Sequence, residues 1–241
     1  GSRAVELGLI TLKGTKYLAN IMFVLGLLTA AGILYTSYLN TGSTSNAYHA
    51  AIIALIGVLI GYFYTAKPIR LSSRYGLGEI SIFLAFGPLL TLGTGFAIAA
   101  ETIIPYSNEF YNLLILGMPI GLLTTNILFI NQYPDYTSDK KVGKNHLVVL
   151  IGKKASRWIY ALNFAIAVGS LYFISENIVN DTQGLLFMYL LIPITMIYSF
   201  YLISGLFKYY NSRELIKYNI HTIYFHMFFS FVYMIILANF Q

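Results

Sequence analysis

The sequence of 241 residues contains no cysteine. This absence excludes disulfide bonds, thiolate metal sites and a cysteine nucleophile. Charged residues are also scarce, since they make up 10% of the chain, against about 25% in soluble globular domains. A soluble protein of this length could not bury the apolar surface that remains, so we expect a lipid bilayer to solvate much of it.

Hydrophobic residues make up 57% of the chain. They concentrate in seven stretches long enough to cross a bilayer, which takes about 20 helical residues. The sequence therefore predicts an all-α fold, a transmembrane helical bundle that forms a single domain over residues 1–241. The expected spans lie near 16–38, 48–66, 79–100, 109–131, 156–175, 183–207 and 218–240.

Basic residues occur in alternate connections between these spans. All 15 Lys and Arg lie in the N-terminal segment or in the second, fourth and sixth connections, whereas the connections on the other side carry acids only. The positive-inside rule then predicts a multi-pass protein whose basic connections are cytoplasmic, in a prokaryotic plasma membrane. Because topology explains the net charge of +6, we expect no nucleic-acid partner.

The fourth connection carries Asn131, Asp135 and Asp139, spaced by four residues. Side chains at this spacing share one face of a helix, and two carboxylates on one face suit a hard cation such as Mg²⁺ together with phosphate oxygens. Lys144, just beyond, could meet the phosphate charge. The alternative is that the acids are solvated or pair with neighbouring lysines. Pro134 makes the shared face approximate, because proline kinks a helix.

The second connection carries Lys67, Arg70 and Arg74 within eight residues, interleaved with Pro, Tyr and Gly. This pattern fits a loop that holds a diphosphate, and it also fits a basic loop that faces lipid headgroups. Glu79 can be explained as the start of the next helix, where an acid suits the helix dipole.

Together the two connections resemble the UbiA-type intramembrane prenyltransferases. The segment 131–144 is similar to their second aspartate-rich motif. The segment 64–79, followed by Phe86-Gly87-Pro88, is similar to the menaquinone branch, which attaches a polyprenyl chain to 1,4-dihydroxy-2-naphthoate. Asn145-His146 departs from the Thr usual after Gly-Lys. Members have nine helices and a first aspartate-rich motif after the second, so we expect residues 1–241 to follow that motif; the alternative is a degenerate member.

The resemblance implies an enzyme that transfers a polyprenyl chain from prenyl diphosphate to an aromatic acceptor with Mg²⁺ as cofactor. Asp135 and Asp139 would be the catalytic residues and would hold the metal with Asn131. The implied substrate-binding residues are Lys67, Arg70, Arg74 and Lys144 for the diphosphate, and Tyr64 and Asn126 near the reacting centre. Asn126 could equally join two helices.

Other functions stay open at this stage. Within the family the acceptor could be 4-hydroxybenzoate, chlorophyllide, haem or a glycerol-phosphate lipid. Pro88, Pro119 and Pro193 lie inside spans, which also fits a membrane transporter. A retinal protein is excluded because residues 218–240 contain no Lys. His226 fits a hydrogen-bonded interior histidine, and Gly93, Gly95, Gly117 and Gly121 are expected to permit close helix packing.

Overall fold

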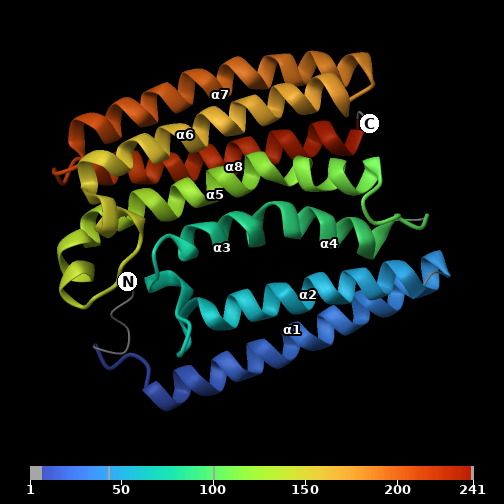
Figure 1. Cartoon of the computed structure of the whole chain (residues 1–241), viewed down its shortest axis with the longest axis horizontal. Helices are drawn as coiled ribbons and strands as arrows, with labels where there is room; N and C mark the ends of the chain where they lie inside the picture. The colour runs from blue at the N-terminus through green and yellow to red at the C-terminus, as the bar shows by residue number, and fades with distance from the viewer. Residues whose placement is uncertain (1–6, 43, 100, 240–241) are drawn as a thin grey trace.

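The computed structural model describes residues 7–42, 44–99 and 101–239, and this part of the chain is helical and forms no strand. Seven helical segments are long and apolar enough to cross a membrane, with α3 and α4 together forming one of them. The predicted all-α, seven-span architecture is confirmed (Figure 1). The elements are α1 (Leu12–Thr41), α2 (Thr44–Thr65), the short 3₁₀ helix η1 (Leu71–Ser73), α3 (Leu77–Phe86), α4 (Pro88–Ile98), α5 (Asn108–Lys141), α6 (Leu147–Asn177), α7 (Thr182–Tyr209) and α8 (Leu215–Asn239).

Three spans differ in extent or continuity from the sequence-based expectation. Helix α5 continues ten residues beyond the predicted 109–131, with Pro134 inside it, and so carries the aspartate motif as helix. Helix α6 begins at Leu147 rather than near 156 and is interrupted at Gly152, whose φ is 82°. The predicted span 79–100 is broken between α3 and α4, where Pro88 opens a new helix after Gly87. Hydropathy identifies only the apolar part of a helix. Helices α5 and α6 are longer than predicted because their helical backbone extends into polar sequence.

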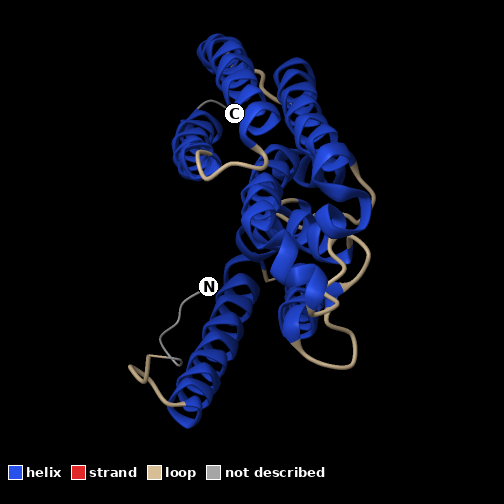
Figure 2. Cartoon of the chain, turned by 90° about the vertical axis from the view of Figure 1, so that its left-hand side faces the viewer, coloured by secondary structure: helices blue, strands red, loops and turns tan. Residues whose placement is uncertain are grey.

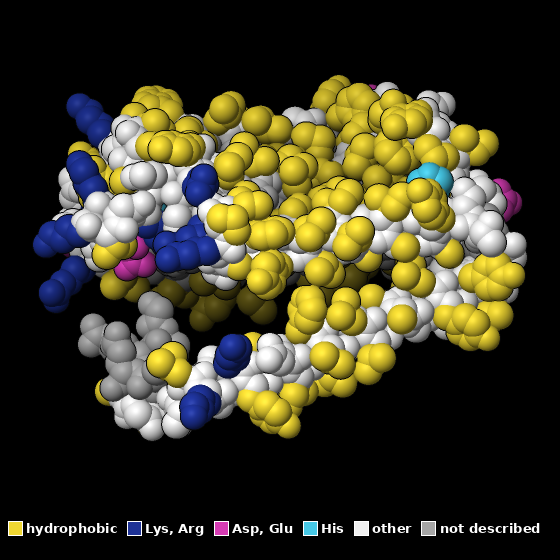
Figure 3. Space-filling view, turned by 60° about the horizontal axis from the view of Figure 1, so that its bottom comes forward, with side chains coloured by type: hydrophobic (Ala, Val, Ile, Leu, Met, Phe, Trp, Pro, Cys, Tyr) yellow, Lys and Arg dark blue, Asp and Glu magenta, His cyan; other side chains and the backbone are white. Residues whose placement is uncertain are grey.

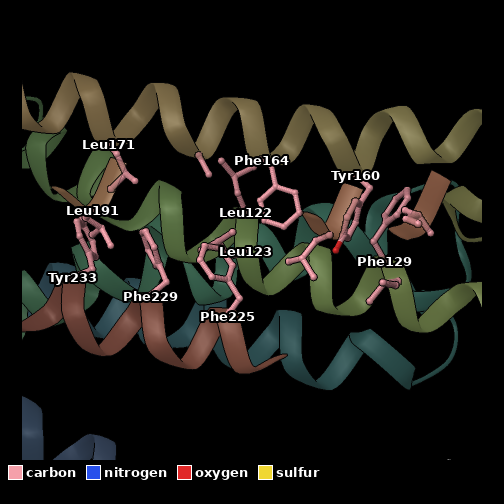
Figure 4. Packing of buried hydrophobic residues seen from close by; sticks show 14 of the residues in the cluster. Leu122, Leu123, Phe129, Tyr160, Phe164, Leu171, Leu191, Phe225, Phe229 and Tyr233 are labelled. Atoms are coloured by element: carbon pink, nitrogen blue, oxygen red, sulfur yellow. The ribbon is translucent and has the colours of Figure 1, made fainter. Parts of the chain in front are cut away.

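Helices α5, α6, α7 and α8 form a bundle, and α3 and α4 pack on its α5 side (Figure 1). Helix α1 packs on α2 and α4 and stands away from the bundle in the perpendicular view (Figure 2). The bundle interior is rich in aromatic side chains, with Phe129 of α5, Phe164 of α6 and Phe229 of α8 all at most 1% exposed (Figure 4). This core fixes α5 and α6, the two helices that flank the fourth connection.

Three glycines let α3 and α4 approach α5 closely. A Cβ added to Gly117 would lie 2.5 Å from the carbonyl of Gly87, and one added to Gly121 would lie 2.9 Å from the Gly87 Cα. Gly93 and Gly95 also have neighbours within 3.0 Å of an added Cβ. The expected role of Gly93, Gly95, Gly117 and Gly121 in close packing is confirmed.

The connections alternate between the two ends of the molecule. The α2–α3, α5–α6 and α7–α8 connections lie at one end, on the left in Figure 1. Lys and Arg side chains gather at that same end in the space-filling view, while apolar side chains cover the middle (Figure 3). The structure is that of a multi-pass integral membrane protein with one basic end.

Candidate active site

The two sequence motifs meet at the basic end of the molecule. Arg74, in the α2–α3 connection, forms an isolated parallel bridge with Asn145, in the α5–α6 connection. The Tyr75 N–H donates to the Asn145 carbonyl at 2.7 Å, and the Asn145 N–H donates to the Ser73 carbonyl at 3.1 Å. These two backbone hydrogen bonds hold the basic loop against the end of the aspartate motif.

Asp139 lies in the last turn of α5 and is contacted by two side chains. Lys144 Nζ lies 3.0 Å and His146 Nε2 lies 3.1 Å from its Oδ2 atom. The chain reverses at Gly143, which has a φ of 70°, and the Lys144 N–H donates to the Asp139 carbonyl at 2.9 Å. A glycine in this left-handed conformation is the usual way to end a helix, and here it returns Lys144 to the carboxylate.

His146 joins Asp139 to the start of α6. Its side chain is buried, and Nδ1 accepts a hydrogen bond from the Val149 N–H at 3.4 Å as the N-cap of the helix. The hydrogen atom therefore belongs on Nε2, which donates to Asp139. Burial lowers the pKa of His146, while the contact with Asp139 acts in the opposite direction. Burial is the larger effect and the net pKa is lowered, which favours a neutral imidazole that donates from Nε2.

The other predicted metal ligands lie on the same helix. Asp135 and Asn131 are exposed. Asn131 donates from Nδ2 to the Ile127 carbonyl and accepts at Oδ1 from Asn219 of α8. Within the described ranges, no group of three or more His, Cys, Asp or Glu side chains could hold a metal ion. That Asp135, Asp139 and Asn131 hold Mg²⁺ therefore stays a prediction; a site with so few protein ligands would take its remaining ligands from a phosphate and water.

The predicted substrate-binding residues divide between the basic end of the molecule, called the rim below, and the interior of the helical bundle. Lys67, Arg70 and Arg74 are exposed in the α2–α3 connection, and Arg74 donates from Nη2 to the Pro68 carbonyl at 2.8 Å. Tyr64, at the end of α2, is half-buried and lies within electrostatic reach of Glu79. The bridge at Arg74 brings this loop to the rim that Lys144 occupies.

Asn126 is fully buried in α5 and bonds twice to α6. Its Nδ2 donates to the Tyr160 carbonyl at 3.2 Å, and its Oδ1 accepts from Asn163 Nδ2 at 2.9 Å. These bonds fit the helix-joining alternative, while a role for Asn126 near the reacting centre stays a prediction. His226 is hydrogen-bonded to Thr124 at 2.8 Å, as expected for an interior histidine.

Sequence reasoning missed the buried contact between Glu79 of α3 and Gln132 of α5. Glu79 is 3% exposed, and its Oε1 accepts hydrogen bonds from Gln132 Nε2 at 2.9 Å and from the Leu147 N–H at 3.0 Å. The carboxylate thus lies at the N-terminus of α6 as well as in the first turn of its own helix, α3. An acid is stabilised by the positive N-terminal end of a helix dipole, and Glu79 lies at the N-terminal ends of both α3 and α6.

A cavity of about 190 Å³ opens beside Glu79. Residues of α3, α5 and α6 line it, and most of them are apolar or aromatic. The lining residues are Glu79, Ile80, Phe83, Leu122, Thr125, Phe129, Leu147, Ile159 and Asn163. Leu147, which directly follows His146 in the chain, lines this mostly apolar space. Charged residues suit a charged leaving group, and an apolar space suits a reactive intermediate that must be kept from water.

Residues 2–232 match the UbiA prenyltransferase family. The chain belongs to this family. It is 30% identical over 51% of its length to a 1,4-dihydroxy-2-naphthoate octaprenyltransferase of Bacillus subtilis. It is 34% identical over 52% of its length to a 2-carboxy-1,4-naphthoquinone phytyltransferase of Synechocystis. A 1,4-dihydroxy-2-naphthoate octaprenyltransferase of Haemophilus influenzae is 25% identical over 68% of the chain.

The aligned parts of this UbiA-family chain span 37%, 37% and 50% of the lengths of those three relatives. No solved structure matches the chain. Membership of a family of prenyltransferases does not favour the transporter alternative. The resemblance to the family, drawn from the two connections, is confirmed.

Proposed function

We propose that this UbiA-family chain takes part in the transfer of a polyprenyl chain from prenyl diphosphate to 1,4-dihydroxy-2-naphthoate, within the bilayer and at its cytoplasmic side. The observation that carries the proposal is the junction of the two motifs at Arg74 and Asn145. It brings the basic loop to the segment that follows Asp139, next to Leu147, which lines the apolar cavity. The names of the relatives support the naphthoate acceptor.

In this reaction the bond between C1 of the prenyl group and the diphosphate oxygen breaks, and the electron pair leaves with the diphosphate. A ring carbon of the acceptor forms the new carbon–carbon bond to C1, and that carbon loses its carboxylate as CO₂. Mg²⁺ held by Asp135, Asp139 and Asn131 would neutralise charge on the diphosphate. Lys67, Arg70, Arg74 and Lys144 would contact the same diphosphate, because fixed cations stabilise a leaving anion.

The apolar cavity would keep the allylic cation from water until the ring attacks. Phe83 and Phe129 line that cavity, and aromatic faces attract cations. Tyr64 and Asn126 complete the set of residues proposed near the reacting centre. Of these, Tyr64 lies within electrostatic reach of Glu79, and Asn126 is bonded to the cavity residue Asn163.

The test is a transfer assay on the purified full-length protein in lipid, with labelled polyprenyl diphosphate, 1,4-dihydroxy-2-naphthoate and 4-hydroxybenzoate as acceptors. We expect transfer to the naphthoate that requires Mg²⁺ and falls at least about 100-fold in Asp135→Asn, since the lost group stabilises charge in the transition state. Asp181→Asn is the matched control, because Asp181 caps α7 at the opposite end and Asn caps equally well. Transfer only to 4-hydroxybenzoate would overturn the naphthoate acceptor, and no transfer would overturn the activity.

A further inference from the structure

Glu79 keeps one carboxylate oxygen without a partner in the protein interior. Its Oε1 accepts two hydrogen bonds, whereas Oε2 is buried and has no hydrogen-bond partner in the described part of the chain. Buried carboxylate oxygens are rarely left without a donor, because desolvation is costly unless a hydrogen bond replaces water. A donor is therefore expected at this position, either a group of a bound ligand or a proton that Glu79 itself carries toward Gln132 Oε1, which is also buried without a partner in the described residues.

The other polar side chains that line the cavity are hydrogen-bonded within the protein. The Thr125 hydroxyl donates to the Gly121 carbonyl at 2.8 Å, and Asn163 Nδ2 donates to Asn126 at 2.9 Å. Glu79 thus lines a cavity whose other walls are mostly apolar, and the unpaired Oε2 belongs to this same buried side chain. A ligand that fits it chemically has a flat apolar body and brings its own O–H donor.

Size and position agree with an aromatic ligand. An engineered cavity of about 150 Å³ takes up benzene, so a space of about 190 Å³ accommodates a substituted aromatic ring. Gln132 precedes Asp139 by seven residues on α5, which is about 10 Å along a helix. His146 contacts Asp139 while the next residue, Leu147, donates to Glu79. The cavity and the proposed diphosphate site are therefore connected through adjacent residues at the start of α6.

We propose that this cavity binds the aromatic acceptor and that Glu79 Oε2 accepts a hydrogen bond from one of its ring hydroxyl groups. Gln132 is a positioning residue, since its amide holds Oε1 of the carboxylate at 2.9 Å. The hydrogen bond leaves the proton on the ring oxygen but increases electron density on that oxygen and in the ring. The inference rests on the proposed function for the identity of the acceptor, and Glu79 is the group that would select a hydroxylated ring.

The first test changes the ligand rather than the protein, so it does not depend on a variant that folds. Binding of 1,4-dihydroxy-2-naphthoate and of its dimethyl ether to the purified full-length protein is measured without prenyl diphosphate. We expect the diol to bind at least about 10-fold more tightly, because the ether cannot donate and leaves Oε2 unpaired. Equal affinity for the two compounds would overturn the proposal.

The second test uses Glu79→Gln, which keeps the shape of the side chain but can place an N–H where Oε2 accepts. We expect the KM for the naphthoate to rise about 10-fold or more, the KM for prenyl diphosphate to stay unchanged, and the preference for the diol over the ether to disappear. Glu101→Gln, an isosteric change at an exposed residue of the opposite end, should match the wild type. Measured thermal unfolding confirms that each variant is folded.

A proton on Glu79 would explain the unpaired oxygen without any ligand, and it predicts a different result for Glu79→Gln. Gln132 Oε1 is also buried without a partner, and a proton carried by Glu79 could satisfy both oxygens. Glu79→Gln would then reproduce the protonated pair, and unchanged binding of the diol would overturn the acceptor role of Glu79. Diol binding that depends on Glu79 in a protein without transfer activity would instead reject only the proposed function. Wild-type transfer with unchanged Glu79→Gln kinetics would reject only this inference.

Discussion

At the scale of single residues, His146 has two roles that substitution can separate. Its Nδ1 caps α6 by accepting the Val149 N–H, and its Nε2 donates to Asp139. Asn is among the best N-cap residues, but its side chain is too short to serve both groups at once. Asn at this position therefore retains the cap and removes the contact with the carboxylate.

We expect His146→Ala to lower the free energy of unfolding by about 1 kcal/mol, the usual cost of a lost N-cap, and His146→Asn to restore it. Both variants should need about 10-fold more Mg²⁺ for half-maximal prenyl transfer, because removing the partner that orients a metal ligand typically costs this much. Thermal unfolding and Mg²⁺ titrations of activity measure the two effects separately. Wild-type Mg²⁺ dependence in His146→Asn would show that His146 does not orient Asp139.

Relations within one segment were easier to predict from the sequence than contacts between distant segments. Asp135 and Asp139 were expected on one helix because helical periodicity relates positions four apart, and both lie on α5. Glu79 and Gln132 lie 53 positions apart in the chain, and their contact depends on how α3 packs on α5. No local pattern encodes that contact, so Glu79 was explained only as the start of a helix.

At the scale of the secondary-structure elements, the close approach of α3 and α4 to α5 positions Glu79 against Gln132. Hydropathy predicted all seven spans, but it could not predict the break at Gly87 or the helical extension of α5 past residue 131. The bridge between Arg74 and Asn145 was equally hidden, since it joins two irregular loops whose meeting depends on the helices beneath them.

We expect Gly117→Ala to destabilise the protein by about 1–3 kcal/mol, the usual cost of forcing extra atoms into a well-packed contact. The added Cβ would lie 2.5 Å from the backbone of Gly87, so α3 and α4 must shift relative to α5. Acceptor KM should rise as Glu79 moves away from Gln132. Thermal unfolding and transfer kinetics measure both effects.

Gly26→Ala is the matched control for this prediction. Gly26 is also helical, and an added Cβ there has no neighbour within 4 Å, so unfolding and kinetics should equal those of the wild type. If Gly117→Ala behaved like Gly26→Ala, the glycine contact between α4 and α5 would not be what positions the site.

At the scale of the whole molecule, the basic side chains and the proposed site lie at the same end. The basic side chains gather where the α2–α3, α5–α6 and α7–α8 connections lie (Figures 1 and 3). A charged diphosphate that enters from water would reach this end first, while its apolar tail can remain in lipid. The positive-inside rule predicts that this end faces the cytoplasm, and it therefore predicts the same side for the proposed site.

The absence of cysteine makes this orientation directly testable, because an introduced cysteine is the only thiol in the chain. Asn211 is exposed in the α7–α8 connection at the basic end, and Thr102 is exposed in the α4–α5 connection at the other end. We expect a membrane-impermeant maleimide to label Thr102→Cys in intact cells, and to label Asn211→Cys only after the membrane is permeabilised. Labelling of Asn211→Cys but not Thr102→Cys in intact cells would reverse the topology, and the diphosphate would then have to be supplied from outside the cell.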